Sequence, residues 1–359
     1  MRKKLTTALV AAGLVLTAGA QEKKAFIEVP QWVKDIKLSG YGMVQYQGSD
    51  KEQAHENTFS LRLARFSAEA RPHKDFYAKV QMQINGNTSE GSSAIRLVDL
   101  FGEWQKYKYF MVKAGQFKRP FTFENPMHPI TQGFMSYSQN VSKLAGFSDR
   151  TGEQASNGRD IGLQVQGDLL PDASGRCWLH YQAGVFNGQG INTKDGDNRK
   201  DLIGGLWVMP AKGLRIGVFG WTGSRGINYT DPATGVSTTR SLPKNRYAFS
   251  AEYTANDWTL RSEYIHSQGY DANYKKGDKA DGIYALCIAP VISQKFHVKA
   301  RYDLYRDAKE WGSSKTFYEL GADYMFTKNL QLNIEYARVN ERATDSNYNM
   351  VDVELDFRF

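Results

Sequence analysis

Residues 75–85 read DFYAKVQMQIN, and their side chains alternate between apolar and polar. In an extended chain, Phe76 and Val80 lie on one face and Lys79 and Gln81 on the other, because successive side chains of a strand point to opposite sides. This period of two predicts a β-strand that separates an apolar surface from an aqueous one.

The same alternation continues along the chain and predicts sixteen strands. The phase of the first, second and twelfth strands is ambiguous, so we expect a bulge or a misplaced boundary in these three. The predicted strands lie near residues 36–46, 58–71, 75–85, 94–105, 109–117, 159–169, 176–186, 201–209, 213–222, 245–255, 258–267, 281–290, 294–305, 315–326, 330–339 and 348–359.

The connections between these strands are alternately short and long. Residues 256–257 are typical of the short set, and residues 118–158 and 223–244 are the longest of the long set. An even number of strands, with short turns at one end and long loops at the other, is typical of bacterial transmembrane β-barrels. The terminal Phe359, on the apolar phase of the last strand, agrees with the C-terminal aromatic residue usual in such barrels.

The composition leaves a choice between a soluble all-β protein and an outer-membrane barrel. The chain has 359 residues, a net charge of +8 and 13% aromatic residues. Beyond the N-terminus no apolar run approaches the ~20 residues of a membrane helix. A barrel of sixteen strands encloses an aqueous interior, and lipid outside with water inside satisfies both faces. We therefore predict an all-β, closed, antiparallel transmembrane β-barrel of about 16 strands.

The first residues have the order of features of a secretory signal peptide. Basic residues come first, an apolar stretch follows, and Ala18-Gly19-Ala20 ends it. We expect residues 1–20 to be removed by cleavage near Ala20; the alternative is a buried N-terminal helix. Residues 21–34 would form a short periplasmic segment, residues 35–359 the barrel, and the mature protein would lie in the bacterial outer membrane.

The sequence offers no constellation for catalysis or metal binding. It has six scattered histidines and two cysteines, and lacks CxxC, HExxH and GxSxG motifs. We expect no enzyme activity, no cofactor, no metal and no nucleic-acid partner. Cys177 and Cys287 lie in apolar strands, and the sequence leaves open whether they pair.

The loop over residues 118–158 is a functional candidate because of its length. Its many apolar and aromatic side chains suit a segment that folds into the lumen and narrows the pore. The alternative is a loop packed over the barrel mouth or into a subunit interface.

Three segments carry a resemblance to a known family. FMVKAGQFKRPFTFEN (110–125), GRDIGLQVQG (158–167) and AGVFNGQGINTKDGDNRKD (183–201) are similar to the phosphate-selective porin O and P family of outer-membrane channels. The resemblance implies a homotrimeric passive channel for small anions or other small solutes, surrounded by outer-membrane lipid. It also implies that the third external loop forms the constriction and that basic residues line the path.

The basic residues of this chain that would line the path come from several strands and from the long loop. Acidic residues are mixed among them, so we expect a weak to moderate anion preference rather than tight phosphate binding. The candidates are Arg62, Arg65, Lys79, Lys113, Lys118, Arg119, Lys143, Arg150, Arg159, Lys295, Lys299 and Arg301.

Other interpretations stay open at this point. Arg119 could instead hold the scaffold, and Lys295, Lys299 and Arg301 could simply pair with acidic neighbours across strands. The aromatic-rich loop could provide a stacking surface in a ligand-specific channel for oligosaccharide or hydrophobic solutes. A structural or adhesive surface protein is a further alternative, which ion conductance would exclude.

Overall fold

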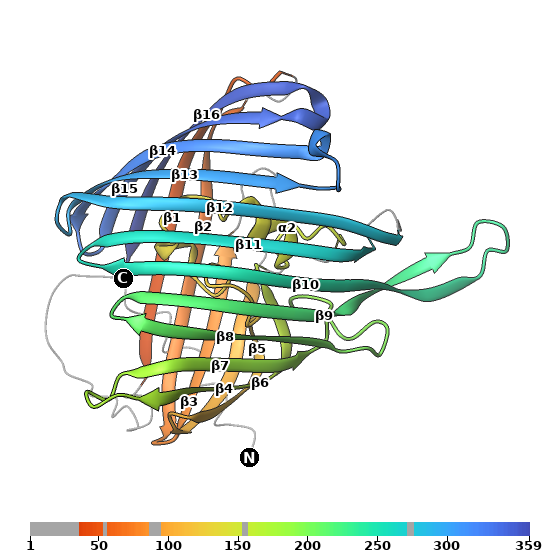
Figure 1. The fold of residues 1–359 in the computed structure, drawn as a ribbon, viewed down its shortest axis with the longest axis horizontal. Helices are drawn as coiled ribbons and strands as arrows, with labels where there is room; N and C mark the ends of the chain where they lie inside the picture. Colours follow the sequence, from red (N-terminus) through yellow and green to blue (C-terminus); the bar gives the residue numbers. More distant parts are fainter. Residues whose placement is uncertain (1–35, 53–55, 86–94, 153–156, 271–275) are drawn as a thin grey trace, which may run out of the picture. The chain divides into compact units, whose positions relative to one another are not determined.

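The computed structural model describes residues 36–52, 56–85, 95–152, 157–270 and 276–359, which belong to one unit. Sixteen antiparallel strands pair in chain order, and the pairing of β1 with β16 closes the sheet into a barrel (Figure 1). The predicted fold class is therefore confirmed. The predicted signal peptide and the segment 21–34 lie outside the described residues.

The strands follow the sequence in order, and most begin and end close to the predicted positions. They are β1 (Lys37–Ser49), β2 (Glu56–His73), β3 (Phe76–Asn85), β4 (Arg96–Tyr107), β5 (Phe110–Lys118), β6 (Arg159–Pro171), β7 (Cys177–Phe186), β8 (Asp201–Ala211), β9 (Leu214–Thr230), β10 (Ser237–Ala255), β11 (Trp258–Tyr270), β12 (Lys276–Ile292), β13 (Phe296–Arg306), β14 (Ser314–Thr327), β15 (Leu330–Glu341) and β16 (Ser346–Arg358).

Helical structure in the described ranges is short. It consists of α2 (Gln139–Leu144) and the 3-10 turns η2 (Pro129–Thr131), η3 (Trp311–Ser313) and η4 (Arg342–Thr344). No helix in these ranges is both long and apolar enough to cross a membrane.

The prediction of a long loop over residues 223–244 is wrong. β9 continues to Thr230 and β10 begins at Ser237, so a short turn joins two long strands. The Gly-, Ser- and Thr-rich composition suggests a loop, but Asp231 closes a tight turn with its backbone and its carboxylate accepts the N–H of Ala233. Figure 1 shows the resulting hairpin running past the ends of its neighbours.

The expected irregularities occur in the expected strands. The β1–β2 register shifts between Met43 and Val44, and the β12–β13 register shifts between Pro290 and Ile292. Pro290 has no N–H to donate to a ladder, which is a physical reason for a shift at that point. In the β1–β2 pair the unmatched residue is Arg62 of β2, because Met43 and Val44 pair with Leu63 and Leu61. The irregularities predicted for the second and twelfth strands are therefore confirmed.

The turn between β10 and β11 shows how the short connections work. Asn256 and Asp257 both have positive φ, 52° and 69°. Two such residues form the turn whose twist matches that of the flanking strands, and Asn and Asp tolerate this conformation better than most residues.

The two faces of the sheet have opposite chemistry. In β13, Val298 is 44% exposed and faces out, while Lys299 and Arg301 are each 4% exposed and face in. The outer wall of the barrel is therefore apolar where it would meet lipid, and its charged side chains are directed inward.

Two glycines allow the barrel to close. A Cβ at Gly42 would lie 2.2 Å from the ring of Phe357, and a Cβ at Gly40 would lie 2.5 Å from the ring of Phe359. The rings of Phe357 in β16 and of Phe359 directly after it therefore lie over β1 at positions where a side chain larger than that of glycine would not fit. The backbones of Gly40 and Phe359 exchange two hydrogen bonds of 2.9 and 3.0 Å at this seam.

A charge placed on the outer wall should destabilise the barrel in lipid. Leu320, in the middle of β14, is 62% exposed and faces out. We expect Leu320→Arg to lower the free energy of unfolding by about 2–4 kcal/mol, because arginine is costly near the bilayer centre. Guanidinium unfolding of the protein in phospholipid vesicles measures the change.

Leu320→Phe is the matched control and should unfold close to the parent. Equal stability of the arginine variant would mean that this face does not contact hydrocarbon.

Candidate functional site

The segment that follows β5 is bound to the inward-facing side of the barrel. The Glu263 carboxylate of β11 accepts the backbone N–H groups of Phe123 and Glu124 at 2.6 and 3.0 Å. Farther along, Asp303 of β13 accepts the N–H of Gln139 at 2.8 Å. The charged inner wall thus satisfies the backbone of a segment that has little secondary structure of its own.

The far end of this segment is held by an ion pair. Arg246 of β10 contacts the Asp149 carboxylate at 2.6 Å, and both side chains are buried. Burial alone would raise the pKa of Asp149, but the Arg246 guanidinium holds it below its ordinary range. The carboxylate therefore remains charged at neutral pH, and the ion pair would be lost as the pH falls through this lowered pKa.

Apolar side chains of the segment also pack against the barrel wall. Phe121 and Phe123 pack edge-on against Trp221 and Phe219 of β9, with ring centroids 5.4 Å apart in each pair. The sequence analysis did not single out Phe219 and Trp221 as inward-facing. The signal was present, since both share the phase of the polar Arg215 rather than that of the outward-facing apolar residues of β9.

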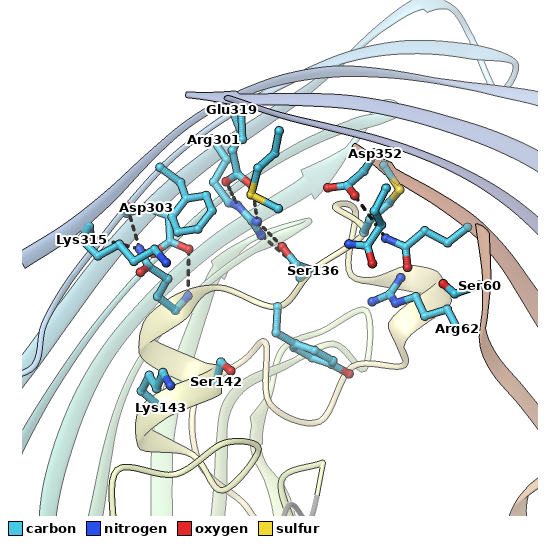
Figure 2. A pocket seen from close by; sticks show the side chains of 18 residues that line it. Ser60, Arg62, Ser136, Ser142, Lys143, Arg301, Asp303, Lys315, Glu319 and Asp352 are labelled. Atoms are coloured by element: carbon cyan, nitrogen blue, oxygen red, sulfur yellow. Dashed lines mark hydrogen bonds and ion pairs between the residues drawn. The ribbon is translucent and has the colours of Figure 1, made fainter. Parts of the chain in front are cut away.

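The larger lumenal cavity, of about 520 Å³, lies between this segment and strands β13–β16, β1 and β2. Figure 2 shows Arg62 and Ser60 on one side, Arg301, Glu319 and Asp303 on another, and Lys143 on the segment. Its charges are mixed in sign: Arg62, Lys143, Arg301 and Lys315 against Asp303, Glu319 and Asp352.

The smaller cavity, of about 280 Å³, lies against β3–β7 and the beginning of the segment. Its charged lining is one-sided. Five basic residues, Lys79, Lys113, Lys118, Arg119 and Arg159, face one acidic residue, Asp99.

The structure brings eight of the twelve candidate path residues to these two cavities and leaves four outside them. Arg65 is buried and donates to the Tyr41 hydroxyl at 3.0 Å. Lys299 pairs with Glu335, and Arg150 pairs with Asp278, each at 2.5 Å.

Lys295 is not brought into the interior. It lies exposed in the turn before β13, with its ammonium 5.5 Å from the ring centre of Tyr324. The alternation of the sequence predicts that Lys295 faces inward, as Lys299 and Arg301 do. The strand begins only at Phe296, so that phase does not extend to Lys295.

Many of the candidate cations have acidic partners. Arg119 pairs with Asp160 at 2.9 Å, and neither side chain is exposed. Arg159 pairs with Asp99 and Arg301 with Glu319, each at 2.5 Å, and Arg62 with Glu354 at 2.8 Å. Such buried pairs position the wall and leave little free charge for a solute.

Three lysines of the smaller cavity are less tightly neutralised. Lys79 and Lys113 lie 3.4 and 3.6 Å from Glu69 and Glu103, and both lysines are partly exposed. Lys118 donates to the carbonyl oxygens of residues 125 and 127, at 2.7 and 3.2 Å, and to the Tyr137 hydroxyl. The ammonium groups of Lys79 and Lys113 therefore leave positive charge beside the open space of the cavity.

The described ranges contain no metal-binding cluster: no three His, Cys, Asp or Glu side chains there lie close enough together to hold an ion. Cys177 and Cys287 are both free thiols and partly buried.

Removing the buried Arg119 charge should cost stability. Arg119→Gln leaves the Asp160 carboxylate buried without its cation, and we expect the free energy of unfolding to fall by about 3–5 kcal/mol. Urea unfolding in detergent micelles, followed by tryptophan fluorescence, measures this.

Lys212→Gln, in the exposed turn between β8 and β9, is the control. If Arg119→Gln is as stable as this control, then the Arg119–Asp160 pair does not support the fold.

Comparison with known proteins agrees with this architecture. The model of the family described as phosphate-selective porin O and P matches residues 39–212. No curated protein matches the chain. The matched residues include all three segments on which the resemblance was based.

Solved structures of outer-membrane proteins share the fold. An anion-selective porin from Comamonas acidovorans is 13% identical, with a TM-score of 0.65 over 90% of this chain and 99% of that one. OmpF of Salmonella typhi, in complex with daunomycin, is 12% identical, with a TM-score of 0.63 over 90% and 97%. The channel DcaP of Acinetobacter baumannii is 11% identical, with a TM-score of 0.61 over 90% and 97%.

These identities are low, so the solved structures bear on the fold alone, and the family match carries the relationship. Channels rather than enzymes make up this family, and family and fold together indicate the bacterial outer membrane. The resemblance drawn from the sequence is confirmed: the model of the phosphate-selective porin O and P family matches residues 39–212, within a barrel of the outer-membrane porin fold.

Proposed function

We propose that the protein is a passive diffusion channel for small hydrophilic solutes, with a weak to moderate preference for anions such as phosphate. The observation that carries the proposal is the lining of the smaller cavity, in which five basic residues face one acidic residue. A wall with an excess of positive charge lowers the energy of a passing anion and raises that of a cation.

The strength of the preference follows from the ion pairs. Arg119 and Arg159 are neutralised by buried carboxylates, so Lys79 and Lys113 provide most of the field that a solute would meet. The larger cavity has nearly balanced charge and adds little. An anion would be attracted but not tightly held, as diffusion through a pore requires.

We further propose that residues 118–158 form the constriction. Their contacts with Glu263 and Asp303 support this, because they hold the segment against the inner wall, where it would occupy part of the lumen. The two cavities border this segment at different points and would be successive parts of that path.

A sugar-stacking channel is less well supported. That alternative requires several exposed aromatic rings on the long loop, but Phe121, Phe123, Phe134 and Phe147 are buried, and a single ring of the loop, that of Tyr137, borders the larger cavity. Their faces are covered by other side chains and offer no platform for a sugar ring.

The remaining features of the proposal concern maturation and assembly. Residues 1–20 would be a signal peptide cleaved near Ala20, which N-terminal sequencing of the mature protein tests, and residues 21–34 would be periplasmic. The mature barrel, residues 35–359, would form a homotrimer. The fold is shared with OmpT of Vibrio cholerae, of which one solved structure is described as a trimer form.

Neutralising two lysines of the smaller cavity should shift ion selectivity. In Lys79→Gln/Lys113→Gln, two positive charges are lost and Glu69 and Glu103 lose their partners. We expect the reversal potential under a KCl gradient, measured in planar bilayers, to move toward that of a cation-preferring pore.

Lys212→Gln/Lys328→Gln, which removes the same charge from exposed turns, is the control and should keep the selectivity of the parent. A reversal potential that does not change in the cavity variant would refute the proposed anion path.

A further inference from the structure

Three aromatic rings line the smaller cavity beside its lysines. Tyr77 of β3, Phe101 of β4 and Phe117 of β5 all border this cavity. The ring centroids of Tyr77 and Phe101 lie 5.9 Å apart, and those of Phe101 and Phe117 also lie 5.9 Å apart. We call these three residues the aromatic row. The proposed ion preference depends on the lysines of the cavity and gives these rings no role.

Part of the aromatic row is open to the lumen. Phe121 and Phe123, in the segment after β5, are 0% and 1% exposed, and other side chains cover them. Tyr77 and Phe101 also face inward, but both are only partly buried. Apolar ring surface in contact with water costs free energy, which is recovered when an apolar part of a solute covers that surface.

The lysines of the cavity alternate with the rings across the strands. Lys79 is paired in register with Phe101 on the neighbouring strand. The Lys113 ammonium lies 4.9 Å from the ring centre of Phe101 and 5.4 Å from that of Phe117. A carboxylate that contacts Lys113 would therefore lie next to the ring surface that the cavity exposes.

Both ammonium groups are able to bind a further carboxylate. The contacts of Lys79 with Glu69 and of Lys113 with Glu103 are long, 3.4 and 3.6 Å, and each ammonium group has three N–H donors. An incoming carboxylate can thus contact a lysine without breaking a short ion pair. Repulsion by the two glutamates keeps such binding weak enough for release, as a channel requires.

We propose that the smaller cavity binds aromatic carboxylates, the solutes in which an acid group is attached to a planar ring. The carboxylate would contact Lys79 and Lys113, and the ring would cover the exposed surface of Tyr77 and Phe101. Inorganic phosphate has no apolar surface and would gain from the lysines alone. The volume of about 280 Å³ is near the lower end of the range for small-molecule sites, about 300–1,000 Å³, and suits a solute with one ring.

This inference rests on the proposed function, because it requires the smaller cavity to be part of the conducting path. It adds the class of solute that the path favours. The two proposals have separate measurements. The reversal potential under a KCl gradient reports the ion preference without any ring-bearing solute, whereas block of the chloride current by an added carboxylate reports binding in the cavity.

The test uses the full-length mature protein in planar bilayers at neutral pH, with three probes. Sodium benzoate has both the ring and the charge, sodium acetate has the charge alone, and benzamide has the ring alone. The concentration of each probe that halves the single-channel chloride current is measured at constant ionic strength. We expect benzoate to act at a concentration about tenfold lower than acetate or benzamide, because benzoate alone makes both contacts.

Removal of the rings should abolish the advantage of benzoate over acetate. Tyr77→Leu/Phe101→Leu keeps both lysines, so we expect the half-blocking concentration of benzoate to rise about tenfold while the reversal potential under a KCl gradient stays that of the parent. Tyr77→Phe keeps the ring and should be blocked by benzoate as the parent is.

Phe76→Leu/Phe110→Leu is the matched control. These two rings belong to β3 and β5, but they are 46% and 39% exposed on the outer wall, so their removal should leave block by benzoate unchanged. Heat-dependent migration on gels checks that each variant is folded. The comparison of the three probes on the parent needs no variant and stands by itself.

Three results would overturn the inference. The first is equal block of the parent by benzoate and acetate, which would mean that the rings contact no solute. The second is block by benzamide at the same concentration as benzoate, which would mean that the charge is not used. The third is unchanged block by benzoate in folded Tyr77→Leu/Phe101→Leu, which would place the bound solute elsewhere.

Failure of the proposed ion preference has a different signature. An unchanged reversal potential in Lys79→Gln/Lys113→Gln would contradict that preference, and the three probes on the parent would still decide whether the cavity binds aromatic carboxylates.

Discussion

Hydrogen bonding of the backbone in a medium without water is the constraint on which the rest of this structure depends. Each strand must find a partner on both sides, and only a closed sheet provides one for the first and last strands. Closure then fixes what each residue faces, because the side chains of one strand alternate between the outside and the lumen. The apolar exterior and the charged interior are two consequences of the same geometry.

The charged side chains in the interior of the barrel are stabilised by pairing with groups of opposite charge. Arg119 with Asp160, and Arg246 with Asp149, are fully enclosed pairs that connect the inward-folded segment and the wall around it. Lysines at the edge of open space, such as Lys79 and Lys113, have longer and partly exposed contacts. The enclosed pairs, which include Lys299 with Glu335, thus hold the lumen together, whereas Lys79 and Lys113 remain within reach of the open space.

The strands could be predicted from the sequence because the alternation of apolar and polar side chains is a local property. It can be recognised within any segment of about ten residues. The β9–β10 hairpin could not, since its outer half lies beyond the apolar band and has the composition of a loop. Ion pairs were also beyond prediction. Arg159 and Asp99 are 60 residues apart, and only the register of the folded sheet brings them together. Lys295 shows the reverse error, in which a periodic pattern was extended past the end of its strand.

The seam at Gly40 and Gly42 has a consequence for biogenesis. It joins the first strand to the last, and the contact of Gln45 with Asp352 spans 307 positions of the chain. Closing so large a loop is entropically costly, and contacts of long sequence separation form slowly. The barrel therefore cannot close before the C-terminal strand is in place, and until then β1 has an edge of unpaired backbone groups.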